Sequence, residues 1–369
     1  MIRKVMMKVL IKIMRKKGYS SYFAPKIIKE TINDFKNTKN VNFRRKIWAY
    51  KKGFFSSNIV KYGLNDENYR DYMPDFDYYK LHPINGQFGK WIDDKMTLKY
   101  ILREFNEYLP EYYFYLQKGK ITKLIDCPEE YGNEVSSILN LLENKRNLAV
   151  KLIAGSLGEG FYKLSYKNKE YMINNEVVSL EYVVTFLSDL NNYTITEYLF
   201  SHKDIREIFP ETANNLRVML VNDETQKNPK ITGSFIKFGT KKSGMIEHVW
   251  AGGIFCKVDL NTGNFSSART MEDGEFVEVL KHPDTNTFLY GTIPYWSMIE
   301  EILLEISNYI PQVRYMGFDI IITDDSFKII EINSHQGINL MQAFYPLMKC
   351  DYNTKFFKRL RNEKSEVIK

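Results

Sequence analysis

The sequence predicts an α+β fold in which two mixed lobes follow a helical N-terminal region. Two observations predict the lobes. Short runs rich in Ile and Phe flank a polar turn at residues 316–342, and a Gly-rich loop separates two further runs at residues 147–174. Residues 20–90 look helical and irregular instead, without the alternating strands of a doubly wound parallel sheet. We expect four segments, which are residues 1–90, 91–200 (the N-lobe), 201–350 (the C-lobe) and a basic tail at 351–369.

The first 30 residues contain the basic excess of the chain. The formal net charge is +7, and residues 1–30 hold nine Lys or Arg and one acid, Glu30. Lysines recur every four residues at Lys4, Lys8, Lys12 and Lys16. Apolar residues occupy another side, so the pattern predicts a basic amphipathic helix over residues 1–17. Such a helix either lies on an anionic membrane surface or docks its apolar side on the protein.

Other function classes are disfavoured. Lysines interrupt the apolar part of the N-terminal helix, and no run of about 20 apolar residues exists, so we expect neither a signal peptide nor a membrane span. Outside residues 1–30 the chain is nearly neutral and has no nucleic-acid recognition motif, so we expect no nucleic-acid partner. The three cysteines form no CxxC pair, and no HExxH occurs, which disfavours zinc and disulfides and favours a reducing cytoplasm.

Three longer helices follow from the sequence. We predict them at Thr97–Tyr108, which ends before Leu109-Pro110, at Glu181–Leu190 and at Tyr295–Ile310. Strands dominate residues 203–345 apart from the last of these helices.

A Gly-rich loop between two strands is the first candidate binding element. Leu148–Ile153 is an apolar run that contains Lys151, and a buried lysine needs an anionic partner to keep its charge. Residues 155–160 follow as Gly-Ser-Leu-Gly-Glu-Gly, and glycines let backbone N–H groups approach a phosphate. Because Phe161–Tyr166 reads as a strand, a Walker loop is excluded. The segment is either a flap over a nucleotide or an ordinary flexible hairpin loop.

A hairpin near the C-terminus is the second candidate element. Phe318–Thr323 and Phe327–Asn333 predict two strands around a polar turn, and symmetry about the turn places Asp319 opposite Glu331. Cross-strand partners lie about 5 Å apart at Cβ, and Asn333 points to the same face as Glu331. Two carboxylates and an amide oxygen suit a hard cation such as Mg²⁺. The alternative is a solvated hairpin edge with ordinary surface acids.

The opposite face of this hairpin is predicted to be apolar. The residues expected there are Ile320, Ile322, Ile330 and Ile332.

Together these elements resemble the ATP-grasp superfamily over roughly residues 91–342. The resemblance implies two α+β lobes with ATP between their sheets. It implies that two lysines, the glycine flap and a hinge bind the nucleotide. The lysines are Lys95 and Lys151, the flap residues are Gly155, Ser156, Gly158, Glu159 and Gly160, and the hinge residues are Glu197, Tyr198 and Leu199. It assigns Mg²⁺ to Asp319, Glu331 and Asn333.

Ordered short motifs narrow the resemblance to the sugar-transfer-associated ATP-grasp group, whose members are linked to exopolysaccharide assembly. The motifs are Ser201-His202, Asn215-Leu216-Arg217, Gly252-Gly253, Asp259-Leu260-Asn261-Thr262-Gly263, His282-Pro283-Asp284-Thr285 and Ile293-Pro294-Tyr295-Trp296. Two departures occur. Gln336 stands where many relatives have Pro, and the usual Arg just before the metal-binding Asp is missing. Arg217 and Lys237 are the candidates to meet the γ-phosphate in its place.

The resemblance implies an ATP-dependent carboxylate–amine ligase that works through an acyl phosphate. Its context suggests that a uronic acid of a surface polysaccharide, or of its sugar precursor, is joined to an amino acid or amino alcohol. A glycan or sugar kinase of the same fold and a non-catalytic scaffold docked on a membrane are the alternatives. We expect a cytoplasmic protein that associates peripherally with the inner face of the plasma membrane through residues 1–17.

His335 follows the predicted metal ligands by two residues. It is a candidate catalytic residue that orients the acceptor or acts as a base, or else a loop histidine held by hydrogen bonds.

Overall fold

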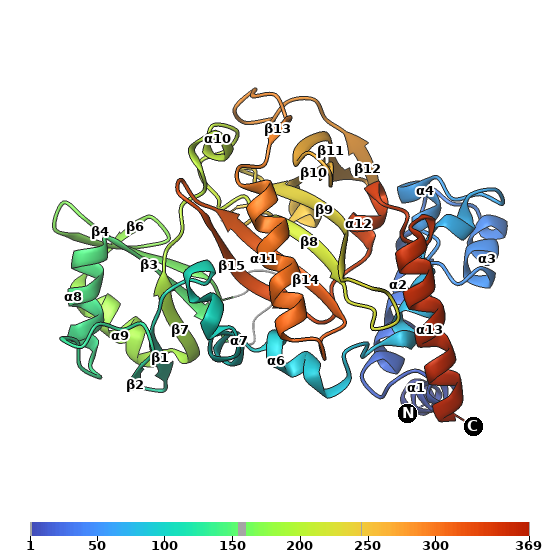
Figure 1. Ribbon diagram of the computed structural model, residues 1–369, viewed down its shortest axis with the longest axis horizontal. Coiled ribbons are helices and arrows are strands. Elements are labelled where there is room, and N and C mark those ends of the chain that lie inside the picture. The colour runs from blue at the N-terminus through green and yellow to red at the C-terminus, as the bar shows by residue number, and fades with distance from the viewer. Residues whose placement is uncertain (1, 154–159, 245, 369) are drawn as a thin grey trace.

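The computed structural model describes residues 2–153, 160–244 and 246–368. Three parts lie side by side: the N-lobe, the C-lobe, and a helical N-terminal region on the far side of the C-lobe (Figure 1). Both lobes contain antiparallel sheets and helices, so the predicted α+β class is confirmed.

The N-terminal region is built from short helices around two small apolar clusters. The helices are α1 (Ile2–Lys16), α2 (Phe23–Asn37), α3 (Phe43–Lys51), α4 (Asn58–Tyr62) and α5 (Asp75–Leu81). The connection to the N-lobe contains α6 (Lys90–Asp93) and α7 (Lys95–Ile101). Within the described residues, no helix is long and apolar enough to cross a membrane.

The N-lobe sheet has seven strands in the described part of the chain, in the order β2-β1-β7-β3-β4-β5-β6. The strands are β1 (Tyr112–Gln117), β2 (Lys120–Lys123), β3 (Asn147–Leu152), β4 (Tyr162–Lys167), β5 (Glu170–Ile173), β6 (Glu176–Val178) and β7 (Asn191–Glu197). Helices α8 (Val135–Lys145) and α9 (Leu180–Asp189) pack on one face, where Leu148, Val150 and Ile195 form the core with them. The other face bears Lys151.

The C-lobe sheet has eight strands in the described ranges, in the order β12-β11-β10-β9-β8-β14-β15 with β13 beside β11. The strands are β8 (Leu216–Val221), β9 (Lys230–Phe238), β10 (Ile254–Val258), β11 (Asn264–Glu272), β12 (Glu275–Glu278), β13 (Gly291–Thr292), β14 (Tyr315–Ile322) and β15 (Phe327–Asn333). Helix α11 (Trp296–Tyr309) covers one face (Figure 1). Short helix α10 (Lys203–Arg206) precedes the sheet, and α12 (Asn339–Phe344) and α13 (Asp351–Ile368) pack on part of its other face.

The predicted helix over Thr97–Tyr108 is wrong in its extent. Helix α7 ends at Ile101, and a 3₁₀ turn follows over Arg103–Tyr108. Leu102 between them is fully buried in the C-lobe core, and Phe105 packs against the ring of Tyr309. Tertiary packing therefore overrides the helical pattern of this segment.

A bulge in the β14–β15 hairpin corrects the predicted apolar face. Asp319 lies opposite Glu331, as the sequence predicts, but Ile320 then pairs with Ile329 instead of Ile330. Ile330 is the extra residue and is only half-buried, whereas Ile329 is buried. The bulge shifts the alternation of the strand by one residue.

The predicted basic tail is part of a packed helix. Phe356, Phe357 and Leu360 of α13 are buried in the cluster that also contains Met219 and Phe235 of the C-lobe sheet. Their spacing places them on one side of the helix, with Lys355 and Lys358 exposed outside.

This packing gives a testable prediction. Phe356→Ala should lower the free energy of unfolding by about 3–5 kcal/mol because it empties a buried site. Lys358→Ala, on the exposed side of the same helix, should change it by less than about 0.5 kcal/mol. Urea denaturation measures both values, and equal effects would contradict the packed helix.

Candidate functional site

A row of charged side chains crosses three neighbouring strands of the C-lobe. Strand β14 pairs with β8 on one side and with β15 on the other, and the registers set Arg217 opposite Asp319 and Asp319 opposite Glu331. Directly paired residues point to the same face. This face lies opposite the one covered by α11, since Leu216 and Val218 on either side of Arg217 pack with that helix.

Asp319 is the centre of this row. Its two carboxylate oxygens accept hydrogen bonds from Nε and Nη2 of Arg217, each at 2.7 Å. Lys237 on β9 places its Nζ 3.9 Å from the same carboxylate, and Asn333 donates from Nδ2 at 3.3 Å. Burial alone would raise the pKa of Asp319, but Arg217 and Lys237 outweigh it and hold the pKa below its usual value. Asp319 is therefore a buried anion.

The N-lobe side brings two lysines to the row. The Nζ of Lys95, which is 8% exposed at the start of α7, lies 3.6 Å from Oε1 of Glu331. Lys151 lies on β3, and burial together with repulsion from Lys95 lowers its pKa to about 8. Glu331 and Glu197 oppose this shift. Both predicted phosphate lysines thus lie in one electrostatic cluster with a predicted metal ligand.

The donor chemistry fits Mg²⁺. A carboxylate offers about four lone-pair sites, so the two bonds from Arg217 leave sites on Asp319 for a cation. Asn333 presents Nδ2 in this structure and would turn its amide over to offer Oδ1. The described residues contain no group of three or more His, Cys, Asp or Glu that could hold a metal. Two carboxylates and an amide suit an ion that completes its shell with water and phosphate oxygens.

The predicted hinge connects β7 with the C-lobe. Oε1 of Glu197 accepts a hydrogen bond from the backbone N–H of Glu111 and lies 3.8 Å from Nζ of Lys328. Burial raises the pKa of Glu197, and Lys328 opposes the shift. The contact with Lys328 on β15 joins the hinge to the hairpin that bears Glu331.

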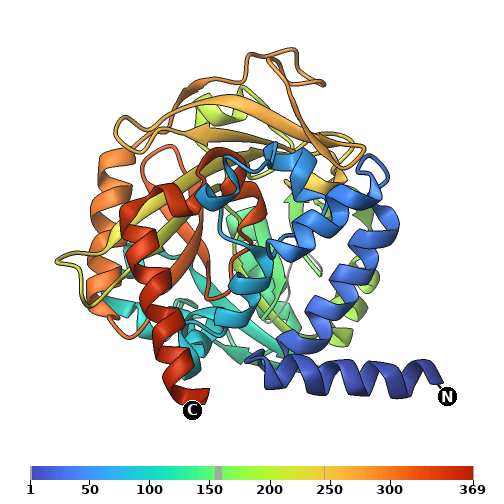
Figure 2. The ribbon, with the colours of Figure 1, turned by 90° about the vertical axis from the view of Figure 1, so that its right-hand side faces the viewer.

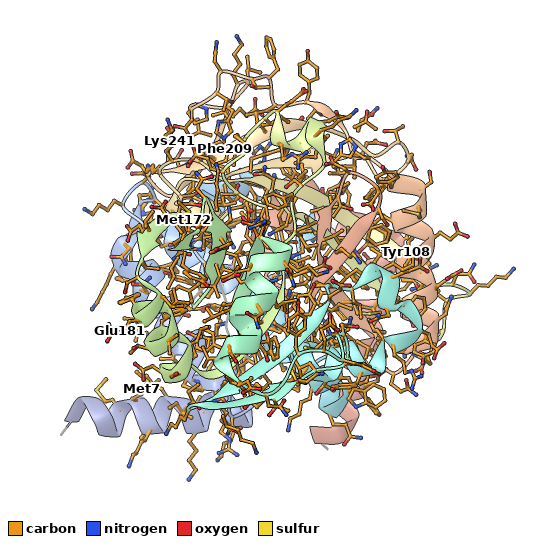
Figure 3. All side chains as sticks on the ribbon, turned by 90° about the vertical axis from the view of Figure 1, so that its left-hand side faces the viewer. Met7, Tyr108, Met172, Glu181, Phe209 and Lys241 are labelled. Atoms are coloured by element: carbon orange, nitrogen blue, oxygen red, sulfur yellow. The ribbon has the colours of Figure 1, made fainter. Side chains whose placement is uncertain are left out.

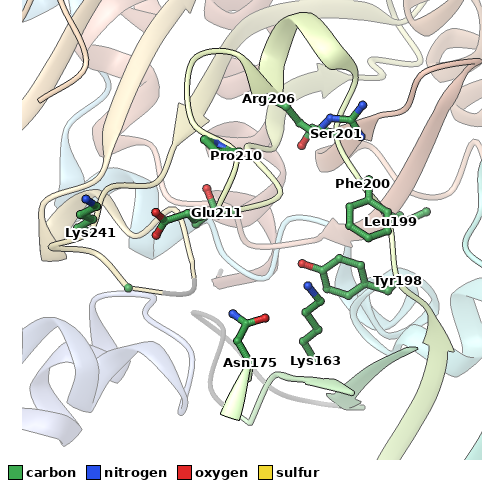
Figure 4. Close-up of a pocket in the computed structure, with 12 residues that line it drawn as sticks. Lys163, Asn175, Tyr198, Leu199, Phe200, Ser201, Arg206, Pro210, Glu211 and Lys241 are labelled. Atoms are coloured by element: carbon green, nitrogen blue, oxygen red, sulfur yellow. The ribbon is translucent and has the colours of Figure 1, made fainter. Parts of the chain in front are cut away.

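A cavity of about 440 Å³ lies beside Tyr198 and Leu199 of the hinge (Figure 4). Lys163 and Asn175 of the N-lobe face Glu211 and Lys241 of the C-lobe across this cavity (Figure 4). Nζ of Lys163 lies 4.8 Å from the centroid of the Tyr198 ring. The cavity therefore lies between the two lobes, next to the segment that is predicted to bind the nucleobase.

Lys163 belongs to the same face of the N-lobe as Lys151. It pairs with Ala149 across β3 and β4, and Ala149 is two residues from Lys151. The sequence analysis missed Lys163 because its alternating pattern with Leu164 is that of any half-buried strand.

Most of the predicted glycine flap lies outside the described residues. Gly155, Ser156, Gly158 and Glu159 belong to that segment. Gly160 is described and has φ +67°, and a Cβ there would lie 2.6 Å from Cδ1 of Leu152. A side chain at this position would be both strained and crowded, which explains the glycine.

His335, one of the candidate catalytic residues, lies in a cluster of aromatic rings. Its ring packs against His82 and Phe23, with centroids 3.8 Å and 4.5 Å away. Burial, followed by the nearby Lys26, lowers the pKa of His335 to about 3. The chain turns after Asn333, so His335 joins the aromatic contacts of the N-terminal region, and these contacts favour a structural role for its ring.

Glu247 is a further residue that the sequence analysis missed. This buried carboxylate accepts hydrogen bonds from the backbone N–H of Asn214 at 2.6 Å and from Nδ2 of Asn215 at 3.2 Å. Burial raises its pKa, and Lys237 is the strongest influence that opposes the shift. Glu247 thus fixes the turn before β8, which bears Arg217. It lies in a loop without periodic pattern, so no local signal identifies it.

A comparison with curated protein sequences finds no match. Solved structures with similar folds include the ATP-grasp ligase PsnB in complex with a minimal precursor, at 10% identity and a TM-score of 0.39, where the match covers 75% of this chain and 63% of that one. The chain thus spans less than two thirds of that structure.

Two further structures are the D-alanine–D-alanine ligase of Bacillus anthracis and the D-alanyl-alanine synthetase A of Vibrio cholerae O1. The first has 12% identity and a TM-score of 0.38, with coverage of 74% of this chain and 69% of that one. The second has 10% identity and a TM-score of 0.42, with coverage of 74% and 66%. A family model described as sugar-transfer associated ATP-grasp matches residues 77–346, well over half of the chain. The chain therefore belongs to the sugar-transfer associated ATP-grasp family.

Proposed function

We propose that this protein is an ATP-dependent carboxylate–amine ligase that releases ADP and phosphate. One observation supports this most strongly: the acidic residues Asp319 and Glu331 lie among Lys95, Lys151 and Arg217 where the two lobes meet. A site with this mixture of charges can hold a magnesium nucleotide, because the cations meet phosphate oxygens and the acids meet the metal.

The residues have distinct proposed roles. Lys95 and Lys151 contact the α- and β-phosphates, and Tyr198 and Leu199 contact the adenine through their backbone. Glu197 meets the ribose with the carboxylate oxygen that does not bind Glu111. Asp319, Glu331 and Asn333 would hold Mg²⁺, which when bound neutralises charge on the β- and γ-phosphate oxygens.

The reaction has two steps. An oxygen of the acceptor carboxylate attacks the γ-phosphorus, the bond to the β-phosphate oxygen breaks, and ADP leaves with that electron pair. An amine then attacks the carbonyl carbon of the acyl phosphate, phosphate leaves, and the nitrogen loses a proton to give the amide. Arg217 and Lys237 would stabilise the charge on the transferring phosphoryl group. Both cations already contact Asp319, the proposed metal ligand, and so lie where the phosphates would bind.

The family description associates the group with sugar transfer, which supports a sugar as the source of the carboxylate. Uronic acids are a class of sugars that bear a carboxylate, and we propose a uronic acid of a surface polysaccharide such as a capsule or exopolysaccharide, or of its sugar precursor. The amine would be an amino acid or an amino alcohol.

We also propose a place for the reaction. A cytoplasmic position suits an ATP-dependent enzyme whose three cysteines are free. A peripheral position at the inner face of the plasma membrane suits residues 1–17, which hold seven basic residues and no acid.

A product assay tests the ligase assignment. Purified protein is incubated with Mg²⁺ and ATP, a panel of uronic acids and a panel of amines. ADP and phosphate are quantified, and the product mass is measured. The proposal predicts ADP release that needs both acceptors and a product lighter by one water than their sum. A stable phosphorylated sugar formed without amine would identify a kinase instead.

The metal assignment predicts the effect of two conservative changes. Asp319→Asn or Glu331→Gln should lower turnover by about a hundredfold or more while the thermal unfolding transition persists, because each change removes charge at the metal–phosphate contact. Asp325→Asn, in the exposed turn of the same hairpin, is the matched control and should retain activity. Steady-state ADP release measures all three, and near-wild-type rates in both site variants would disprove the assignment.

The phosphate assignment predicts that two lysines behave differently. Lys151→Met should weaken ATP binding strongly, because it removes a partly buried charge that faces the cluster. Lys145→Met should leave binding nearly unchanged, since Lys145 pairs with Glu111 on the surface. Isothermal calorimetry compares the two, and equal affinities would contradict the model.

The lowered pKa of Lys151 predicts a pH dependence. Without a nucleotide, Lys151 has a pKa of about 8. A bound phosphate would raise this pKa. Above pH 8, ATP binding therefore requires that Lys151 take up a proton. The affinity of the wild-type protein for ATP should therefore fall as the pH rises above 8, by up to about tenfold per pH unit. The Lys151→Met variant should lack this dependence. A flat wild-type profile would contradict a lowered pKa at Lys151 that rises when the nucleotide binds.

A further inference from the structure

Helix α1 has one face docked on the protein. Met7, Ile11 and Met14 are half-buried and pack on the apolar cluster that contains Tyr19, Ile27, Ile28 and Phe55. The helix lies along one end of the molecule, where Met7 is labelled in Figure 3, and it extends past the body of the protein (Figures 2 and 3). The docking alternative raised by the sequence is therefore correct for this face.

A second face of α1 exposes large apolar side chains. Met6, Val9, Leu10 and Ile13 are 59%, 52%, 39% and 44% exposed. Their spacing of i, i+3, i+4 and i+7 forms one continuous stripe along the helix. Single exposed apolar residues are ordinary on a protein surface, but a stripe of four large ones in a row indicates a partner.

The third face of α1 is basic. Lys8, Lys12, Arg15 and Lys16 are exposed, and the first acidic residue of the chain is Glu30. At about 100° per residue, Lys16 lies only about 20° from Val9 around the helix, so the basic face borders the apolar stripe. A surface that joins apolar side chains to a row of cations is complementary to an anionic lipid leaflet.

We propose that α1 lies in the plane of an anionic membrane while it stays docked on the protein. The stripe of Met6, Val9, Leu10 and Ile13 enters the interface between headgroups and acyl chains, and the basic face contacts lipid phosphates. The docked face, with Met7, Ile11 and Met14, holds the rest of the protein in place. This inference deepens the proposed membrane location, does not depend on the ligase chemistry, and makes α1 a rigid anchor instead of a loose tether.

This geometry determines how to test the anchor. Deleting residues 1–17 would expose Tyr19, Ile27 and Ile28 and would confuse loss of binding with loss of stability. Substitutions on the exposed faces avoid the problem. The stripe variant is Val9→Gln with Ile13→Gln, and the charge variant is Lys8→Gln with Lys12→Gln. Glutamine is a good helix former, so α1 should persist in both.

The matched controls change exposed residues elsewhere. Leu280→Gln removes an apolar side chain that is 82% exposed, and Lys120→Gln with Lys227→Gln removes two exposed charges. Each protein is sedimented with vesicles of mixed phosphatidylglycerol and phosphatidylcholine and with vesicles of phosphatidylcholine alone, at low and high salt. Calorimetry with ATP and size-exclusion chromatography without lipid accompany each protein.

The wild-type protein and both controls should sediment with the anionic vesicles at low salt and remain in solution with phosphatidylcholine alone. The charge variant should partition about thirtyfold less, because each of the two basic residues near the surface contributes a gain of about fivefold. The stripe variant should also bind the anionic vesicles severalfold more weakly than the wild type. High salt should weaken wild-type binding, since the screening length falls to about 3 Å at 1 M. All proteins should bind ATP alike.

Three results would overturn the inference. The wild-type protein could remain in the supernatant with anionic vesicles at low salt. The stripe variant could sediment as well as the wild type. The wild type could self-associate without lipid while the stripe variant is monomeric, which would assign the stripe to a second copy of the chain. Failure of the wild type to bind ATP would instead count against the proposed function.

Discussion

The ion pair between Arg217 and Asp319 is the interaction on which the site depends. Both side chains are largely buried, and the two bonds of 2.7 Å give each carboxylate oxygen a donor. Removing one partner of a buried pair leaves an uncompensated charge and typically costs about 3–5 kcal/mol. The pair therefore fixes the register of β8 against β14, and through β14 the position of Glu331 on β15.

The pair also explains how the cleft tolerates so many charges. Asp319 and Glu331 lie side by side, and two carboxylates at this spacing repel unless cations separate them. Arg217 and Lys237 form ion pairs with Asp319, and Lys95 forms an ion pair with Glu331 from the N-lobe side. For Lys151, burial and repulsion from Lys95 outweigh the attraction of Glu331 and Glu197, so its pKa falls to about 8. A polyphosphate would supply the anionic charge that this lysine needs.

The sequence predicted those features that depend on local pattern. The hairpin of β14 and β15, the pairing of Asp319 with Glu331 and the strand that bears Lys151 follow from short-range alternation. The bulge at Ile330, the early end of α7 and the burial of α13 depend on packing between distant segments. Such contacts leave no periodic signal in the sequence.

Long-range contacts also set the surroundings of residues that the local pattern could not place. His335 follows Asn333 closely in sequence, yet it packs with His82 and Phe23 of the N-terminal region. Glu247 is distant in sequence from β8, yet it holds the turn that precedes Arg217. The N-terminal helix showed the same limit of local reasoning, because its pattern allowed docking or exposure and the structure combines both.

The central claim is that the cluster around Asp319 binds a metal together with a nucleotide. The most direct measurement is calorimetry of a non-hydrolysable ATP analogue with Mg²⁺ and with a chelator, on the wild type and on the Asp319→Asn, Glu331→Gln double variant. The account predicts that Mg²⁺ strengthens binding to the wild type and that this gain disappears in the double variant. Equal affinities of the wild type with Mg²⁺ and with the chelator would contradict it.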